Sequence, residues 1–158
     1  MSEASEVEEA LLDAARLEAD DDVLVLGGGA LALGVQKRLR DGWVYVVRHE
    51  VDELEELLGE AHAVGATGVA YLVGAPPVLP LPDAAVAAVV GRVPAENGAP
   101  AVTAAELARV LAVGGRVALA ESGRPAGDAI AEALDGAGFG DVVLVNVGDE
   151  VVVSGTRK

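Results

Sequence analysis

The stretch that decides the fold is Val23-Leu24-Val25-Leu26-Gly27-Gly28-Gly29-Ala30-Leu31-Ala32. Its first four residues are all aliphatic, which is typical of a strand buried on both faces in a parallel sheet. The three glycines predict a tight turn, and residues from about 31 to 40 then have helical spacing. A strand, a glycine turn and a helix in this order predict the first half of a βαβ unit.

The same alternation continues on both sides of this stretch. Apolar residues at helical spacing predict a helix over 6–18, and Thr103 with Glu106 has the spacing of a capping box at a helix start. A tight turn at Gly148-Asp149 predicts a closing hairpin. The other expected strands are 43–47, 67–73, 85–90, 116–120, 141–147 and 150–154, and the other expected helices are 51–64, 103–111 and one that begins at Pro125.

This order predicts an α/β fold with a doubly wound, mostly parallel, seven-stranded sheet and a C-terminal antiparallel β-hairpin. We expect one domain, in which a helix within residues 1–20 precedes an α/β unit over 21–158.

Composition narrows the function classes. Acidic residues outnumber basic ones by 26 to 11, for a formal charge of −15. Such a surface repels phosphate backbones and anionic lipid, so we expect neither a nucleic-acid nor a membrane partner. The chain has no cysteine, which excludes disulfides and thiolate metal sites. No other metal-ligand spacing stands out, so no metal is expected. We also find no signal segment or membrane span and predict a cytoplasmic protein.

Three stretches resemble a known family. Leu79-Pro80-Leu81-Pro82-Asp83 precedes the apolar run 86–90, Glu106 to Arg116 reads ELARVLAVGGR, and Ala137-Gly138-Phe139 precedes the hairpin. Together they resemble the class I S-adenosylmethionine (SAM)-dependent methyltransferases, in particular the type 11 group. The resemblance implies a Rossmann-like fold, SAM as cofactor and a methyl acceptor that the sequence does not identify.

The resemblance also implies where the cofactor would bind. Gly27, Gly29 and Ala32 fit the G-x-G-x-x-A pattern, in which glycines let the backbone approach a ligand. Glu121 and Ser122 are candidates to line a substrate opening, and no catalytic residue is identified. The implied cofactor-binding positions are Gly27, Gly28, Gly29, Leu31, Arg48, His49, Glu50, Gly74, Ala75, Gly91 and Arg92.

The chain departs from the family pattern at several of these positions. Arg48 stands where an acidic residue accepts the ribose hydroxyls, and Glu50 is the nearest carboxylate. Leu31 replaces a glycine, and Ala75 replaces the aspartate near the adenine. A hydrogen bond to a charged group contributes roughly 1.5–3 kcal/mol, so loss of the ribose acceptor weakens binding by about tenfold to a hundredfold.

Alternatives therefore stay open. The chain is either an active methyltransferase or a methyltransferase-like scaffold or regulatory subunit with weakened cofactor binding. A third reading is a nicotinamide or flavin dinucleotide-binding domain, with Arg48 facing a ribose phosphate. Arg92 is expected to contact either an anionic ligand or a surface carboxylate. A homodimer is a further expectation, because the cleft is open and a sheet edge is exposed.

Overall fold

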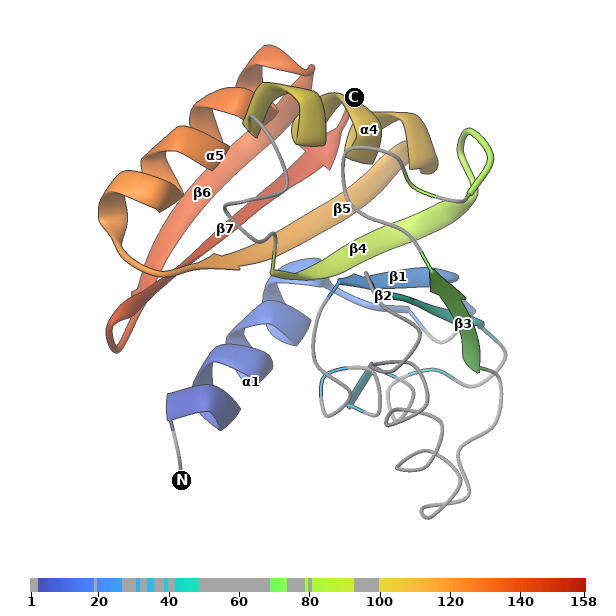
Figure 1. The fold of residues 1–158 in the computed structure, drawn as a ribbon, viewed down its shortest axis with the longest axis horizontal. Helices are drawn as coiled ribbons and strands as arrows, with labels where there is room; N and C mark the ends of the chain where they lie inside the picture. Colours follow the sequence, from blue (N-terminus) through green and yellow to red (C-terminus); the bar gives the residue numbers. More distant parts are fainter. Residues whose placement is uncertain are drawn as a thin grey trace.

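The computed structural model describes residues 3–18, 20–26, 31, 34–35, 39, 42–48, 69–73, 79, 81–92 and 100–158 (Figure 1). Its elements in chain order are α1 (Glu3–Ala15), β1 (Val23–Leu26), β2 (Val44–Arg48), β3 (Val69–Val73), β4 (Val86–Arg92), α4 (Pro100–Val110), β5 (Leu111–Glu121), α5 (Arg124–Gly136), β6 (Phe139–Val147) and β7 (Glu150–Arg157).

The strands form one seven-stranded sheet in the order β3-β2-β1-β4-β5-β7-β6. Strands β1 to β5 run parallel, whereas β7 is antiparallel to both β5 and β6. The chain adds strands outward from β1 in one direction and then returns to place β4 on its other side. The predicted doubly wound α/β fold with a closing antiparallel hairpin is confirmed.

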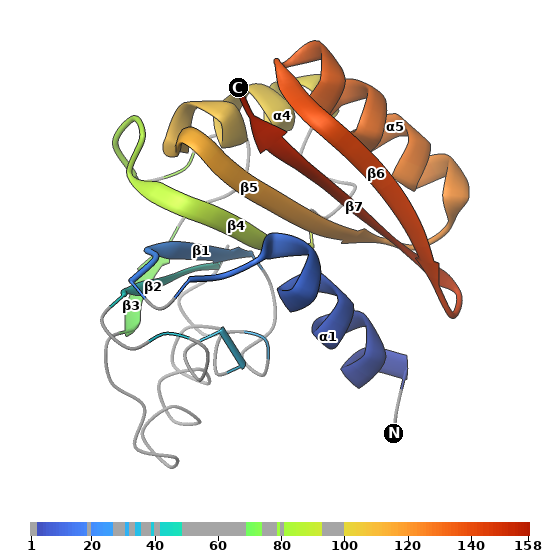
Figure 2. The same cartoon turned by 180° about the vertical axis from the view of Figure 1, so that it is seen from behind.

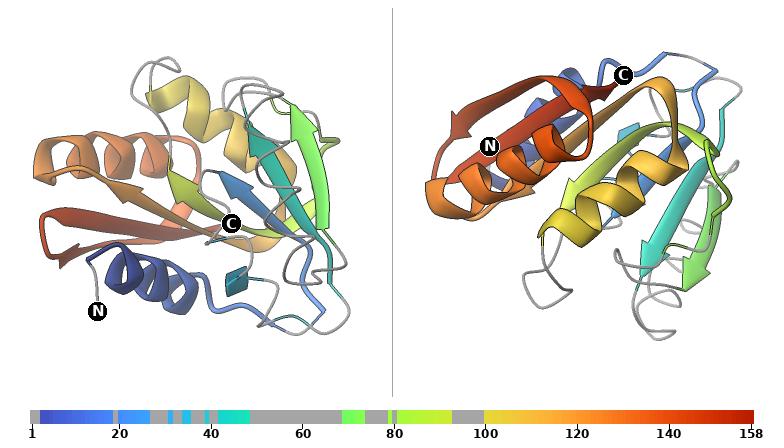
Figure 3. Two further views of the ribbon diagram at one scale, coloured as in Figure 1. Left: turned by 60° about the horizontal axis from the view of Figure 1, so that its bottom comes forward. Right: turned by 90° about the horizontal axis from the view of Figure 1, so that it is seen from above.

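Helices cover both faces of the sheet. Helix α1 packs on one face, while α4 and α5 lie side by side on the other (Figures 2 and 3). Alternate residues of β1 serve the two faces: Val23 and Val25 join the core beneath α1, and Leu24 and Leu26 join the core beneath α4 and α5. In the described part of the chain, no helix is long and apolar enough to span a membrane.

Two local predictions need correction. Helix α4 begins at Pro100, so Thr103 lies inside the helix and is fully buried instead of capping it. Strand β5 begins at Leu111, earlier than expected from the glycines at 114 and 115. The strand accommodates them through an irregularity against β4, where Val86 pairs with Leu111 but Ala88 already pairs with Arg116.

Glu106 has a different role from the predicted cap. Its carboxylate accepts the backbone N–H of Leu79 at 2.6 Å and the guanidinium of Arg109. Arg109 in turn donates to the carbonyl oxygens of Leu79 and Leu81 and to Asp83. The side chains of the ELAR segment therefore hold the 79–83 segment against α4, so two of the family-like stretches bind each other at the amino end of β4.

A buried ion pair ties the N-terminal segment to the sheet. Asp21 and Arg116 form a salt bridge in which the side chains are only 9% and 15% exposed. Asp21 also accepts the Glu18 backbone N–H at 2.9 Å, and Arg116 donates to the Ala15 carbonyl oxygen at 2.7 Å. The pair therefore fixes the chain where it leaves α1 and enters β1.

We predict that Arg116→Met lowers the free energy of unfolding by about 3 kcal/mol, because it leaves the buried Asp21 carboxylate without its charge partner. Urea denaturation measures this change. The matched control is Arg124→Met, since Arg124 pairs with Asp128 at the surface, with both side chains more than half exposed; it should cost under about 0.5 kcal/mol. Asp21→Asn combined with Arg116→Met should recover part of the loss. Equal losses of unfolding free energy in Arg116→Met and Arg124→Met would contradict the stabilising role of the Asp21–Arg116 pair.

Candidate functional site

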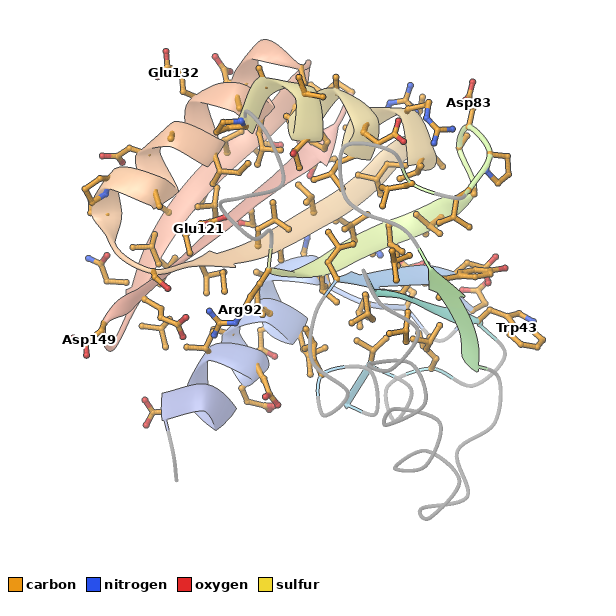
Figure 4. All side chains as sticks on the ribbon, in the orientation of Figure 1. Trp43, Asp83, Arg92, Glu121, Glu132 and Asp149 are labelled. Carbon is orange, nitrogen blue, oxygen red and sulfur yellow. The ribbon has the colours of Figure 1, made fainter. Side chains whose placement is uncertain are left out.

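The carboxyl ends of the parallel strands meet at one edge of the sheet. Strand β1 ends at Leu26 between β2 and β4, and its neighbours there are Val47 and Gly91. The chain switches direction across the sheet at this point. In doubly wound sheets the ligand crevice lies at the carboxyl ends of the strands beside such a switch. In Figure 4, Arg92, Glu121 and Asp149 lie at this end of the molecule, whereas Trp43 and Asp83 lie at the other.

Gly91 allows β1 and β4 to meet closely at the switch point. Its φ of +140° is a conformation that side-chain-bearing residues rarely adopt. A Cβ atom at this position would lie 1.8 Å from the Leu26 carbonyl oxygen. Gly91 was predicted as a cofactor-binding residue, and the structure gives it a packing role against the carboxyl end of β1.

Leu31, Gly34 and Val35 all have helical conformation. The Leu31 side chain is 5% exposed and packs in the core beneath α1. The leucine that replaces the family's glycine therefore directs its side chain away from solvent and into the core.

Arg92 ends β4 and pairs with a carboxylate from the closing hairpin. Its guanidinium makes a two-pronged salt bridge to Glu150, the first residue of β7, with one bond of 2.8 Å. The pairing raises the pKa of Arg92 and lowers the pKa of Glu150. Of the two roles predicted for Arg92, the described contacts favour the carboxylate partner. Sequence reasoning missed Glu150, which lies 58 residues away.

Glu121 ends β5 at the same edge and is half-buried. Burial raises the pKa of its carboxyl group to about 7, and the charge of Arg92 opposes only part of that rise. The group is therefore present in both protonation states near neutrality. Sequence reasoning named Glu121 as a residue that lines an opening, but its altered acidity depends on burial that the sequence does not report.

Part of the predicted site lies outside the described residues. For Arg48 the structure gives the backbone at the end of β2, where it pairs with Val73. The positions outside the described part are Gly27, Gly28, Gly29, His49, Glu50, Gly74 and Ala75.

Three carboxylates do gather elsewhere among the described residues. Ligand atoms of Glu18, Asp20 and Asp21 lie within 4.8 Å of one another. Asp21 is already engaged by Arg116 and by the Glu18 N–H. We therefore assign this cluster a structural role in the turn between α1 and β1.

We predict that Gly91→Ala lowers the free energy of unfolding by about 2–4 kcal/mol, because both the positive φ and the contact with the Leu26 backbone resist relaxation. Gly136→Ala is the matched control: it lies at the end of α5 with no atom within 4 Å of the added Cβ. There the change should be neutral or stabilising, by up to about 1 kcal/mol. Thermal and urea unfolding measure both variants, and similar losses in both would contradict the packing role.

We also predict a pH signature for Glu121. The folded-state pKa of about 7 exceeds the ordinary 4.5, so folded protein binds the proton more tightly and stability falls as pH rises between these values. Between pH 4.5 and 8, the free energy of unfolding of the wild type should fall by about 1–2 kcal/mol more than that of Glu121→Gln, after allowance for solvent screening. Urea titrations at a series of pH values measure the difference, and parallel curves would refute it.

Comparison with known proteins identifies the architecture. No protein-family model and no curated protein sequence matches the chain. Solved structures do match it over nearly its whole length. A SAM-dependent methyltransferase from Aquifex aeolicus aligns over 96% of this chain and 89% of its own, with a TM-score of 0.82 and 21% identity. A geranyl diphosphate methyltransferase in complex with SAM covers 99% and 85%, with a TM-score of 0.78 and 17% identity.

The [4+2]-cyclase SpnF has the same architecture, with a TM-score of 0.84 at 15% identity over 98% of this chain and 81% of its own. At these identities the likeness concerns the fold and leaves the reaction open. The strand order, the antiparallel β7 and the full-length matches agree. The chain therefore has the class I fold of the SAM-dependent methyltransferases.

Proposed function

We propose that the chain binds SAM in the crevice at the carboxyl ends of β1, β2 and β4 and transfers its methyl group to an acceptor. The observation that carries this proposal is the geometry at the end of β1. There Leu26 meets Gly91 at the switch point, and the Leu31 side chain packs in the core. The Leu31 side chain therefore does not extend into the space where we propose that SAM binds.

The order and direction of the strands suit SAM better than a dinucleotide. The usual dinucleotide-binding sheet is parallel throughout, in the order 3-2-1-4-5-6. Here β7 is antiparallel and lies between β5 and β6. A methyltransferase with the same fold is in complex with SAM. When bound, SAM supplies an electrophilic methyl group on a sulfonium centre, and the task of the chain is to position it.

The charges at the carboxyl ends of the parallel strands are compatible with a cationic cofactor. Arg92 alone would repel a sulfonium, but the Glu150 carboxylate neutralises it. Glu121 lies on the neighbouring strand and can accept a proton near neutral pH, because burial has raised its pKa to about 7. We propose that Glu121 takes the proton that an acceptor hydroxyl or amine loses on methylation.

A non-catalytic role is the second candidate, and Arg48 favours it. This arginine is the last residue of β2, one residue beyond Val47, which pairs with Leu26. The family resemblance implies an acidic ribose acceptor at this position, so Glu50 would have to replace it. In that case the chain would act as a scaffold or regulatory subunit with weakened cofactor binding.

Calorimetric titration with SAM and S-adenosylhomocysteine separates these candidates. We expect saturable binding of both ligands and a rise in melting temperature that follows ligand concentration. Glu50→Gln should weaken the binding of S-adenosylhomocysteine at least about tenfold, because it removes the remaining charged acceptor for the ribose hydroxyls. Arg48→Asp should strengthen binding. Glu132→Gln, on the exposed surface of α5, is the matched control and should bind as wild type does.

Two outcomes would overturn the proposal. Absence of binding at millimolar SAM and S-adenosylhomocysteine would favour the non-catalytic role. Stabilisation by a nicotinamide or flavin dinucleotide, without an effect of SAM, would favour the dinucleotide-binding alternative. Unchanged binding in Glu50→Gln would exclude Glu50 as the ribose acceptor while leaving SAM binding intact.

A further inference from the structure

Strand β6 has an open hydrogen-bonding edge. It ends the sheet, and among the described strands its one neighbour is β7. We propose that a second copy of this chain pairs with the free edge of β6 in antiparallel orientation, so that two sheets join into one across a two-fold axis. An exposed strand edge is a template for pairing with another strand, and identical edges form closed, symmetric dimers.

The exposed valines of β6 mark the surface that this pairing would cover. Val143 and Val145 are 49% and 51% exposed and are among the few large apolar side chains in the described part of the chain that face solvent. They lie on the α1 face of the sheet, since Val143 borders a hollow shared with Ala14 and Arg16. Helix α1 packs mainly over β4, β5 and β7, so these two valines stay uncovered.

From Val142 onward, the edge lacks the features that keep edge strands apart. Natural edges are commonly protected by charged side chains, proline, bulges or short length. From Val142 to Gly148 the sequence has no charge and no proline, and β6 is nine residues long. Only its beginning is protected: the register is irregular between Gly140 and Val143, and the Lys158 side chain packs against Gly140.

The hairpin fixes which backbone groups face the open edge. Val147 and Glu150 flank the two-residue turn and form its closing pair. In a two-residue hairpin that pair is hydrogen-bonded, and the pattern alternates along the strands. Val145 therefore directs its N–H and C=O toward β7, whereas Leu144 and Asn146 direct theirs to the open edge. These outward groups are available to a second copy.

One register satisfies these groups without opposing like charges. With the two-fold axis at Leu144, Val142 forms a hydrogen-bonded pair with Asn146 of the second copy. Val143 then faces Val145 of the second copy in a non-hydrogen-bonded pair, where side chains come closest. Asp141 falls opposite Val147, which is uncharged. The aliphatic, neutral strand is thus complementary to itself, which favours a second copy over a charged partner.

Association should depend on salt in a particular direction. Each copy has a formal charge of −15, so two copies repel each other at low ionic strength. Added salt screens this repulsion over a Debye length of about 10 Å at 0.1 M and about 3 Å at 1 M. We expect the dimer to become tighter as salt rises.

Sedimentation velocity over a range of protein concentrations, at low and high salt, tests the proposal on the full chain. Wild type should sediment as a dimer of the 15.8 kDa chain, more so at high salt. Val145→Glu should raise the dissociation constant at least about tenfold, because symmetry places the carboxylate in the interface twice. Asn146→Pro removes an outward N–H and should do the same. Val113→Glu is the matched control: Val113 is 76% exposed on β5 and should leave the dimer intact.

A charge-pair variant tests the register itself. Val143→Lys combined with Val145→Glu places each lysine opposite a glutamate of the second copy and should restore the dimer that Val145→Glu loses. Circular dichroism confirms that each variant is folded. A wild-type chain that stays monomeric at high concentration and high salt would overturn the proposal. A dimer that survives both Val145→Glu and Asn146→Pro would overturn it in favour of another interface.

Discussion

The close approach of β1 and β4 at Leu26 and Gly91 is the constraint on which the rest of the molecule depends. The backbones are so near that a single added carbon atom would lie 1.8 Å from a carbonyl oxygen. This contact joins the two halves of the doubly wound sheet at the strand where the chain changes direction. It therefore sets where β1 ends relative to the charged residues at the ends of β4 and β5.

The amino and carboxyl ends of the strands have different roles. At the amino end of β4, Arg109 and Glu106 bind the 79–83 segment, so the stretch that most resembles the methyltransferase family supports the fold. At the carboxyl ends of the parallel strands lie Arg92, Glu121 and Glu150. Similarity of fold does not establish similarity of site, and the SpnF match is a cyclase with the same architecture.

The closing hairpin connects the site with the surface. Its β7 strand supplies Glu150, which neutralises Arg92 at the edge of the crevice. Its β6 strand presents the uncharged edge that we propose for pairing with a second copy. Because both features belong to one hairpin, assembly at β6 would rigidify the element that holds the Arg92 partner. This arrangement gives the hairpin a part in the electrostatics of the crevice as well as in completing the sheet.

The sequence by itself determined the order of the described elements, the doubly wound sheet and the closing hairpin, because these follow from the local spacing of aliphatic residues and from turn-forming residues. It did not determine the start of α4 or the role of Thr103, because packing against the sheet overrides a local capping pattern. Only the tertiary structure decided that Leu31 points into the core, that Arg92 pairs with Glu150 and that Asp21 pairs with Arg116, 95 residues away. Such contacts, and the raised pKa of Glu121, depend on which segments the sheet brings together and on how much water they exclude, and neither quantity is contained in the spacing of neighbouring residues.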